Sequence, residues 1–333
     1  MDKFEYKETG ETMCVTQRLN NRTVRIGSRA SSLAIAQTRI VADLLKKAYP
    51  DIEVEIVPMQ TTGDRILSKS LEEIGGKGLF ILELNQALEE GRIDLAVHSL
   101  KDMPMDELEF PILAYSKRED PRDVLVLRED IGELPESPII GSSSKRRRLQ
   151  FLKLCEKTKF CLIRGNVQTR IRKLSEEQMD GTILAAAGLK RVNMEHLITR
   201  YFEVDEMIPS AGQGILAVQG KDTVWNRALA ACVNDENAMA EAIAERAFVR
   251  TLDGGCTSPV AAHAQIVNAD NCRDENRNVC TGRRLLLRGL YYREDGTWFV
   301  DTCEGDASHA ELLGVKLAEK MRKESADQGE DDE

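Results

Sequence analysis

The sequence is poor in aromatic residues, in histidine and in long apolar runs, and each scarcity argues against one class of protein. Only 5% of the 333 residues are aromatic and the formal net charge is −10, a composition that argues against nucleic-acid binding. The chain has four histidines, and none of its eight cysteines forms a Cys-x-x-Cys pair, which argues against a metal site and for reduced thiols in a cytoplasmic protein. No run of about 18 apolar residues is present. Residues 1–21 lack the apolar segment of a secretion signal, so we expect neither a membrane span nor export.

The length and the periodicity of the chain predict several α/β units. With 42% hydrophobic residues, 333 residues can bury two or three cores. Strand and helix patterns alternate in a first series at 23–27, 31–47, 54–57, 79–90 and 93–97, and in a second series at 124–127, 138–141, 145–155, 160–164, 167–174 and 181–185. Such alternation is typical of an α/β architecture with mostly parallel pairing of the strands. The C-terminal patterns, a helix at 237–252, strands at 262–267, 285–292 and 297–300 and a helix at 308–322, predict a small α+β domain.

Basic residues are concentrated in one stretch of this acidic chain. Residues 141–173 contain eleven Lys or Arg and one acid, a net charge of +10, so the other 300 residues sum to −20. A compact protein tolerates such a cluster most readily when a polyanionic ligand neutralises it. The residues expected to face this ligand are Arg146, Arg147, Arg164 and Arg170. The residues expected to remain ordinary solvated charges are Lys153, Lys157 and Lys159.

Hydroxyl groups and cations recur at three junctions where a predicted strand gives way to a helix, at 27–33, 141–148 and 164–170. Helix N-termini bind anions, and arginine adds two-point contacts to carboxylate or phosphate. Ser31 is predicted to cap the first of these helices. Arg29 is predicted to project from the carboxyl edge of its strand, where open α/β sheets bind ligands. Together the junctions predict an anion-binding cleft.

The segment His98-Ser99-Leu100-Lys101-Asp102 also follows a predicted strand at its carboxyl edge. Among several cations the ionised form of Asp102 is favoured, so its carboxylate could stabilise a positive charge. A packed side chain is the simpler interpretation of His98. The glycine-rich stretch 74–80, which contains Lys77, lacks the Ser or Thr that follows the lysine of a P-loop, and we interpret it as a flexible lid.

Cys256 lies between a glycine pair and Pro259, just after the predicted helix at 237–252. A lone cysteine is more often a small buried hydrophobe. The flanking glycines and the proline make a poor core site, so this thiol is a candidate for contact with a substrate.

These segments, in their order along the chain, resemble the hydroxymethylbilane synthase (porphobilinogen deaminase) family. The resemblance covers residues 25–322, and an ordered series of this length is highly specific. The strings that carry it are Arg29-Ala30-Ser31, Thr62-Gly63-Asp64, Gly75-Gly76-Lys77-Gly78-Leu79-Phe80, Val97-His98-Ser99-Leu100-Lys101-Asp102-Met103-Pro104, Arg118-Glu119-Asp120-Pro121-Arg122-Asp123, Arg164-Gly165-Asn166, Ala187-Gly188-Leu189-Lys190-Arg191, Gly212-Gln213-Gly214, Glu245-Arg246-Ala247-Phe248 and Gly254-Gly255-Cys256. The sequence departs from the family pattern at Glu73, Gln168 and Ser258.

The resemblance implies a fold of two α/β domains similar to those of periplasmic binding proteins, with a cleft between them, plus a small C-terminal α+β domain. The implied boundaries are 22–119 with 212–235 for the first domain, 120–211 for the second and 236–325 for the third. Residues 1–21 are expected to form a disordered extension and 326–333 an acidic tail. The protein is expected to be a monomer.

The resemblance also implies the chemistry. A dipyrromethane cofactor would be attached to Cys256 through a thioether. Four porphobilinogen molecules would be added head to tail with loss of ammonia, and water would then release hydroxymethylbilane. The catalytic carboxylate of the family falls on Asp102. Its cofactor- and substrate-carboxylate binders fall on Arg29, Ser31, Lys77, Ser99, Lys101, Ser143, Ser144, Arg146, Arg147, Arg164, Arg170 and Arg191.

Two other interpretations compete with this one. A non-catalytic anion-binding module of the solute-binding or regulator type would share the cleft, but the pair of Asp102 and Cys256 and the missing signal peptide speak against it. Nucleic-acid binding through residues 141–173 is disfavoured, because the chain is acidic and its arginines are scattered over separate strand ends.

Overall fold

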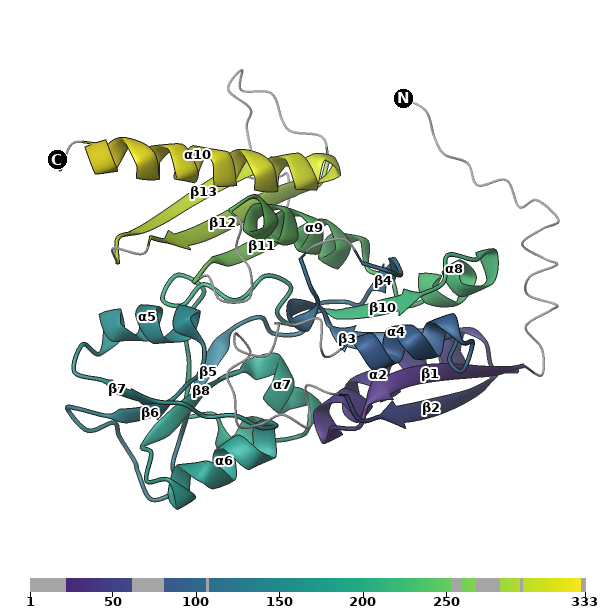
Figure 1. Cartoon of the computed structure of the whole chain (residues 1–333), viewed down its shortest axis with the longest axis horizontal. Coiled ribbons are helices and arrows are strands. Elements are labelled where there is room, and N and C mark those ends of the chain that lie inside the picture. The colour runs from purple at the N-terminus through teal and green to yellow at the C-terminus, as the bar shows by residue number, and fades with distance from the viewer. Residues whose placement is uncertain are drawn as a thin grey trace.

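The computed structural model describes residues 22–61, 81–105, 108–252, 259–267, 282–293 and 296–330. Within these residues the strands form three sheets, and Figure 1 shows each sheet with its own helices. The predicted fold class, two α/β units and a small C-terminal α+β unit, is confirmed. No described helix is long and apolar enough to cross a membrane. The predicted extension at 1–21 lies outside the described residues.

The first sheet has the strand order β2-β1-β3-β10-β4. Its strands are β1 (Thr23–Arg29), β2 (Glu53–Met59), β3 (Leu95–Ser99), β4 (Ile112–Tyr115) and β10 (Leu216–Gly220). Its helices are α2 (Ser32–Ala48), α4 (Leu82–Glu89) and α8 (Val224–Ala231). Apolar residues at helical spacing on α2, among them Val41 and Leu45, pack with α8 on one face of the sheet, and α4 packs on the other.

The second sheet has the order β7-β6-β8-β5-β9. Its strands are β5 (Asp123–Leu127), β6 (Ile139–Gly141), β7 (Lys159–Cys161), β8 (Gly181–Ala185) and β9 (Arg200–Tyr201). Its helices are α5 (Lys145–Leu154), α6 (Val167–Glu176) and α7 (Ala186–Arg191), and a 3-10 turn, η3 (Glu195–Leu197), follows. Residues of α6 and α7 join the core on one face, while Phe151 of α5 packs on the other.

The prediction of mostly parallel pairing is wrong for both sheets, because only two of the four described strand pairs in each sheet are parallel. In the first, β1 is parallel to β2 and β3, but β10 is antiparallel to β3 and β4. In the second, β6 is parallel to β7 and β8, but β5 is antiparallel to β8 and β9. The antiparallel strands β10 and β5 each directly follow a passage of the chain from one sheet to the other, and therefore do not belong to a local strand-helix-strand unit.

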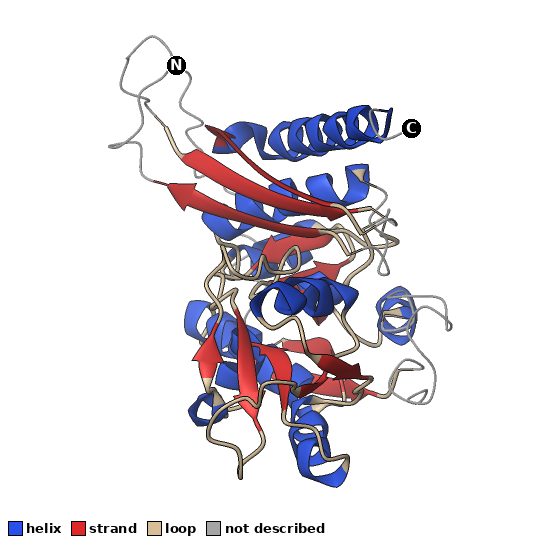
Figure 2. Cartoon of the chain, turned by 90° about the vertical axis from the view of Figure 1, so that its left-hand side faces the viewer, coloured by secondary structure: helices blue, strands red, loops and turns tan. Residues whose placement is uncertain are grey.

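The third sheet is antiparallel, with the order β11-β12-β13. Its elements are β11 (Ala261–Val267), β12 (Arg284–Tyr292), β13 (Trp298–Asp306), the 3-10 turn η5 (Ala307–His309) and the helices α9 (Glu236–Thr251) and α10 (Ala310–Glu330). Residues of both helices and all three strands share one core around Phe248. Figure 2 shows α10 lying along this sheet.

The chain passes between the first two sheets along two segments, 116–122 and 202–215, that hydrogen-bond to each other. The Glu119 amide donates to the Gly214 carbonyl at 3.1 Å, and the Arg118 guanidinium donates to the Gln213 carbonyl at 3.2 Å. Gly214 has φ 91° and its Cα lies so close to the Glu119 carbonyl that a Cβ would overlap it, so glycine is required there. The first segment connects β4 to β5, and the second connects β9 to β10.

Candidate active site

Asp102 ends a single 3-10 turn, η2 (Leu100–Asp102), that continues directly from β3. The turn is anchored to the core at Leu100, which is fully buried and whose amide donates to the Ile215 carbonyl at 3.0 Å. The Met103 amide closes the turn on the Leu100 carbonyl at 3.1 Å. The side chains of Lys101 and Asp102 are therefore held, half-buried, at the carboxyl edge of the first sheet.

Lys101 extends from this turn toward the second sheet. Its Nζ donates to Oε1 of Gln213 at 3.1 Å. Burial is the main cause that lowers the pKa of Lys101 to about 8, and Arg147 of α5 lowers this pKa further while Asp102 opposes the shift. The Lys101 ammonium thus interacts electrostatically with charged residues from both sheets.

The three predicted strand-to-helix junctions have the expected local structure. The capping side chains are Ser31 for α2, Ser144 for α5 and Asn166 for α6. Two of these helix starts meet across the sheets, because Ser32 Oγ donates to Gln168 Oε1 at 2.9 Å. Ser143 is exposed and its hydroxyl donates to the Ile163 carbonyl at 2.6 Å.

Arg170 of the second sheet interacts electrostatically with Asp102 and with Arg164. Arg170 Nε donates to the Gly165 carbonyl at 2.9 Å, which fixes the guanidinium against the start of α6. Burial is the largest cause that lowers the pKa of Arg170 to about 10, Arg147 and Arg164 add to it, and Asp102 opposes it. These residues therefore act on one another electrostatically, although they come from different sheets.

On the first sheet, Arg29 ends β1 and His98 lies near the end of β3. His98 is 6% exposed, and burial lowers its pKa to about 4; a hydrogen bond with Gln219 opposes this shift, Arg29 adds to it and Asp102 opposes it weakly. The imidazole is therefore neutral near pH 7, and its interpretation as a packed residue is confirmed. Ser99 is turned toward α2, since its Oγ accepts a hydrogen bond from Gln37 Nε2 at 2.8 Å.

Arg191, at the end of α7, lies against the second passage between the sheets. Its guanidinium donates to the Gly214 carbonyl at 2.5 Å. Burial lowers the pKa of Arg191 to about 10, and Glu119 opposes that shift. Among the described residues, no group of three or more His, Cys, Asp or Glu side chains is placed to hold a metal ion.

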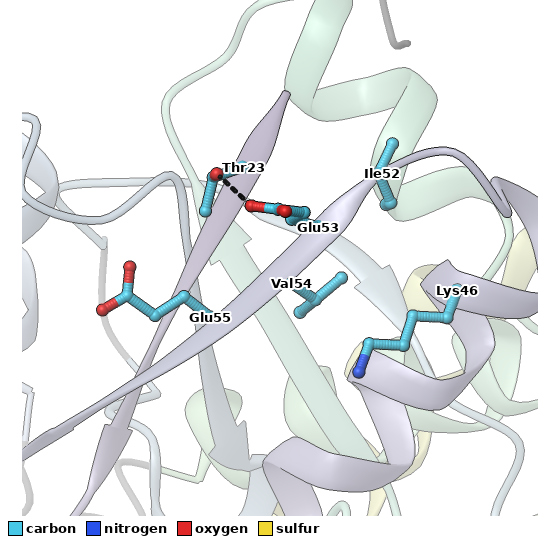
Figure 3. A pocket seen from close by; sticks show the side chains of 6 residues that line it. All are labelled: Thr23, Lys46, Ile52, Glu53, Val54 and Glu55. Atoms are coloured by element: carbon cyan, nitrogen blue, oxygen red, sulfur yellow. Dashed lines mark hydrogen bonds between the residues drawn. The ribbon is translucent and has the colours of Figure 1, made fainter. Parts of the chain in front are cut away.

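A separate hollow of about 590 Å³ lies beside the edge strand β2 and contains none of the predicted site residues. Figure 3 shows its lining of Thr23, Lys46, Ile52, Glu53, Val54 and Glu55. Thr23 Oγ1 donates to Glu53 Oε2 at 3.1 Å, and the charges of the lining are of both signs. This lining of mixed charge differs from the buried cations Lys101 and Arg170 that interact with Asp102.

Comparison with known proteins identifies the family. A family model described as "Porphobilinogen deaminase, dipyromethane cofactor binding domain" matches residues 24–225, and one described as "Porphobilinogen deaminase, C-terminal domain" matches residues 239–323. The chain belongs to the porphobilinogen deaminase family. Relatives named porphobilinogen deaminase include one from Acetivibrio thermocellus, 44% identical over 90% of this chain and 98% of its own, and one from Geobacter sulfurreducens, 40% identical over 90% of this chain and 91% of its own.

Solved structures with some likeness are more distant from this porphobilinogen deaminase family member. The BenM effector binding domain with benzoate is 14% identical, with a TM-score of 0.36 over 64% of this chain and 91% of that chain. An arginine-specific periplasmic binding protein from Salmonella typhimurium is 12% identical, with a TM-score of 0.36 over 64% of this chain and 92% of that chain.

The arginine pair that the family resemblance assigns to carboxylate binding is turned inward. Arg146 and Arg147 are each 7% exposed, and both bind the fully buried carboxylate of Asp123 at 2.7 Å. Their remaining bonds go to the carbonyls of Ile208 and Ile183, at 2.7 and 2.9 Å. Burial would raise the pKa of Asp123, but the two guanidinia outweigh it and hold that pKa well below its usual value. The expectation that the pair faces the ligand does not match these contacts, and its binding role stays a prediction.

The buried cations Lys101, Arg170 and Arg191 suit a polycarboxylate ligand such as the dipyrromethane cofactor of the porphobilinogen deaminase family. Burial makes the charged forms of Lys101, Arg170 and Arg191 less stable than in water, since it lowers the pKa of each. An anionic ligand would offset that penalty. A carboxylate, Asp102, lies within the same field, so the donor set suits a ligand that combines carboxylates with pyrrole N–H groups.

Two predicted residues, Lys77 and Cys256, lie outside the described residues. The chain that flanks Cys256 is described, because α9 ends at Thr251 and β11 begins at Ala261. Helix α9 is tied to the Asp102 turn, since Arg246 donates to the Pro104 carbonyl at 2.5 Å.

Sequence reasoning missed the roles of Asp123 and Gln213, which are both fully buried. Each stood within a string that carried the family resemblance, but only as part of a pattern. The neighbouring residues gave no signal for either role, because Asp123 follows Arg122 and Gln213 stands between two glycines.

Proposed function

We propose that this protein is a hydroxymethylbilane synthase. It condenses four porphobilinogen molecules head to tail, with release of ammonia, on a dipyrromethane cofactor and then hydrolyses off the linear tetrapyrrole hydroxymethylbilane. The observation that carries this proposal is the electrostatic interaction of Asp102 with Lys101 on its own turn and with Arg170 of the second sheet. A substrate with an acetate and a propionate requires cations, and a reaction that passes through a cationic pyrrole benefits from a carboxylate.

In this proposal Asp102 is the catalytic carboxylate. Departure of ammonia from porphobilinogen leaves an electron-poor ring, and the following carbon–carbon bond forms through a cationic pyrrole. An ionised Asp102 beside the pyrrole N–H groups accepts their hydrogen bonds and stabilises this charge. The turn η2 fixes the carboxylate before the substrate arrives, so little reorganisation is needed at the moment of reaction.

The carboxylates of the substrate and of the growing chain are bound by side chains from both sheets. The proposed binders are Arg29, Ser31, Lys77, Ser99, Lys101, Ser143, Ser144, Arg146, Arg147, Arg164, Arg170 and Arg191. Helix starts add backbone N–H groups at Ser31, Ser144 and Asn166. The domain boundaries implied by the family resemblance, a monomeric state, a cytoplasmic location and the absence of a nucleic-acid partner are parts of the same proposal.

Cys256 is proposed to hold the cofactor through a thioether. When bound, the cofactor supplies the pyrrole carbon to which the first substrate is joined. The thiol is an attachment point and not the nucleophile of each cycle, so its covalent bond keeps a growing chain from being lost between additions.

Intact-protein mass spectrometry tests this proposal. Protein made in cells should exceed the mass of the chain by one dipyrromethane and give a colour with Ehrlich's reagent. Cys256→Ala should remove both signals, whereas substitution of the exposed Cys161 should leave them. A chain of unmodified mass that gives no colour would refute the proposal.

The role of Asp102 has its own test. Asp102→Asn keeps the size of the side chain and removes its charge, so we expect a loss of about 100-fold or more in turnover with the fold retained. Asp130→Asn, which removes an exposed carboxylate paired with Arg128, is the matched control and should keep its activity. Release of hydroxymethylbilane at near-normal rates by Asp102→Asn would contradict this role.

A further inference from the structure

Gln213 occupies the second passage between the sheets and is fully buried. It lies between Gly212 and Gly214, whose φ angles are 74° and 91°. Glycine adopts such angles without strain, so the chain can turn sharply on both sides of the glutamine. The Gln213 carbonyl accepts a hydrogen bond from Arg118 at 3.2 Å, which anchors the backbone at this point.

The side-chain amide of Gln213 connects the two sheets. Its Oε1 accepts from Lys101 Nζ at 3.1 Å, on the turn that ends the first sheet's β3. Its Nε2 donates to the Pro121 carbonyl at 2.7 Å and to Asp123 Oδ1 at 3.0 Å, at the start of β5 in the second sheet. One uncharged side chain thus bridges a residue next to Asp102 and the carboxylate that holds Arg146 and Arg147.

Asp123 gives this bridge a fixed end. Its two carboxylate oxygens receive the guanidinia of Arg146 and Arg147, which are held in turn by backbone carbonyls of the second sheet. A carboxylate can only accept, so it selects the NH₂ end of the Gln213 amide. The carbonyl end must then face Lys101, which is the orientation that an ammonium requires.

We propose that Gln213 is a positioning residue that carries the orientation of Asp123 in the second sheet to Lys101, and so holds Lys101 beside the catalytic Asp102. The inference rests on the proposed function, because it assigns Gln213 to the same site. The charged groups that act on Lys101 include Arg146 and Arg147 of α5, Asp102 of η2 and Asp123 of β5. Gln213 adds a neutral acceptor, which directs the ammonium without neutralising it, so the charge stays available to a bound carboxylate.

The principal test is Gln213→Met in the full-length, cofactor-loaded enzyme. Methionine has similar length and removes both the donor and the acceptor. The variant should keep its fold and its cofactor, and turnover should fall about tenfold or more, since a hydrogen bond to a charged group is lost. The ammonium form of Lys101 loses an acceptor, so its pKa falls and the alkaline limb of the pH profile moves to lower pH. Wild-type turnover with an unmoved alkaline limb would overturn the proposal.

Gln219→Met is the matched control. Gln219 is also a fully buried glutamine, on β10, and its Nε2 donates to the Phe110 carbonyl at 2.8 Å. Its replacement removes a buried amide of the same size but should leave the alkaline limb in place. An equal shift of the alkaline limb in both variants would mean that the loss of any buried amide loosens the fold. That result would refute a positioning role for Gln213.

A double variant separates action through Lys101 from any other effect. If Gln213 acts through Lys101, adding Gln213→Met to Lys101→Met should lower turnover by less than about twofold. Independent, multiplicative losses would contradict the proposal. Should Gln213→Met fail to fold, Gln213→Asn replaces it, because its amide is one methylene too short to bridge both partners and should show the same alkaline shift.

Labelling of Lys101 makes this test independent of catalysis. The rate at which trace acetic anhydride acylates Lys101, followed by peptide mass spectrometry across pH, reports the protonation of its amine. In Gln213→Met the midpoint should move to lower pH, and an unchanged midpoint would refute the contact. Absence of synthase activity in the unaltered protein would instead refute the proposed function and leave this readout intact.

Discussion

At the scale of single residues, the buried carboxylate of Asp123 determines where two cations of the basic stretch point. Arg146 and Arg147 lie in the interior because Asp123 accepts from both. Other cations of the stretch are also engaged within the chain: Arg148 lies 5.3 Å from the centroid of Phe160, Lys153 lies over the ring of Trp298, and Lys157 pairs with Glu136. Arg170 is a member of the stretch whose charge interacts with that of Asp102. The excess of positive charge thus serves the fold as well as the site.

Asp123→Asn should destabilise the protein strongly. It leaves two buried guanidinia without their carboxylate, and breaking a buried ion pair costs about 3–5 kcal/mol. Urea unfolding at pH 7 measures the loss, and Asp130→Asn, in an exposed pair, should stay within about 0.5 kcal/mol. Because the folded-state pKa of Asp123 is depressed, its contribution is complete above about pH 4 and is lost as the pH falls further. Equal stability of the two variants would contradict this account.

His98 and His263 should make the fold sensitive to mild acid. Burial lowers their pKa values to about 4 and about 3, below the ordinary value of 6.5. The unfolded chain therefore binds protons that the folded protein excludes, so stability is complete above about pH 6.5 and falls as the pH drops toward 4. Each histidine adds a slope approaching about 1.4 kcal/mol per pH unit. Unfolding at pH 7, 6 and 5 should show a shallower slope for His98→Gln and an unchanged one for the exposed His196→Gln.

Residue-level inference from the sequence succeeded where the signal was local. The cap at Ser31 and the position of Asp102 after β3 both follow from neighbouring residues. The inward orientation of Arg146 could not be predicted, because its partner Asp123 lies 23 residues away on another element. A run of basic residues looks the same whether the cations face a ligand or a buried carboxylate.

At the scale of elements, helices and strands with clear periodicity were predicted and short buried ones were missed. The predicted helix at 167–174 corresponds to α6, and the strand at 181–185 to β8. The missed strands β4 and β10 are short, and β10 is buried throughout, so it shows no alternation of polar and apolar residues. Its pairing with β3 depends on the return of the chain from the second sheet, which no local pattern reports.

Gly314→Ala should weaken the contact between α10 and α9. A Cβ at residue 314 would overlap the Ala244 carbonyl and approach Ala247 Cβ to 2.8 Å. Overpacking costs about 1–3 kcal/mol, which exceeds the gain in helix propensity of about 1 kcal/mol or less. Thermal unfolding should therefore show a lower midpoint, whereas Lys316→Ala, exposed on the same helix, should change it little. A higher midpoint for Gly314→Ala would show that the helices separate without cost.

At the scale of the whole molecule, α9 joins the third sheet to the other two. Arg118, on the first passage between the sheets, binds Glu241 at 2.9 Å and Glu245 at 2.8 Å, both on α9. Glu245 is fully buried and also accepts the amides of Gly212 and Ala264, at 2.6 and 2.7 Å. A single carboxylate therefore contacts the second passage between the sheets and a strand of the third sheet, so the positions of all three sheets are coupled.

Arg118→Met should uncouple the third sheet from the rest. Burial already raises the pKa of Glu245, and Arg118 opposes that shift, so loss of the guanidinium leaves a buried carboxylate without its cation. Breaking such a pair costs about 3–5 kcal/mol. The loss should weaken the contact between α9 and the first passage between the sheets, and it should leave the hydrophobic cores of the three sheets intact. Hydrogen exchange followed by mass spectrometry should show faster exchange in α9 and β11 than in β1 or β8. Arg122→Met, which removes pairs with Asp120 and the exposed Glu203, is the control and should leave β11 protected. A uniform rise of exchange across all three sheets in Arg118→Met would mean that the molecule opens as one unit.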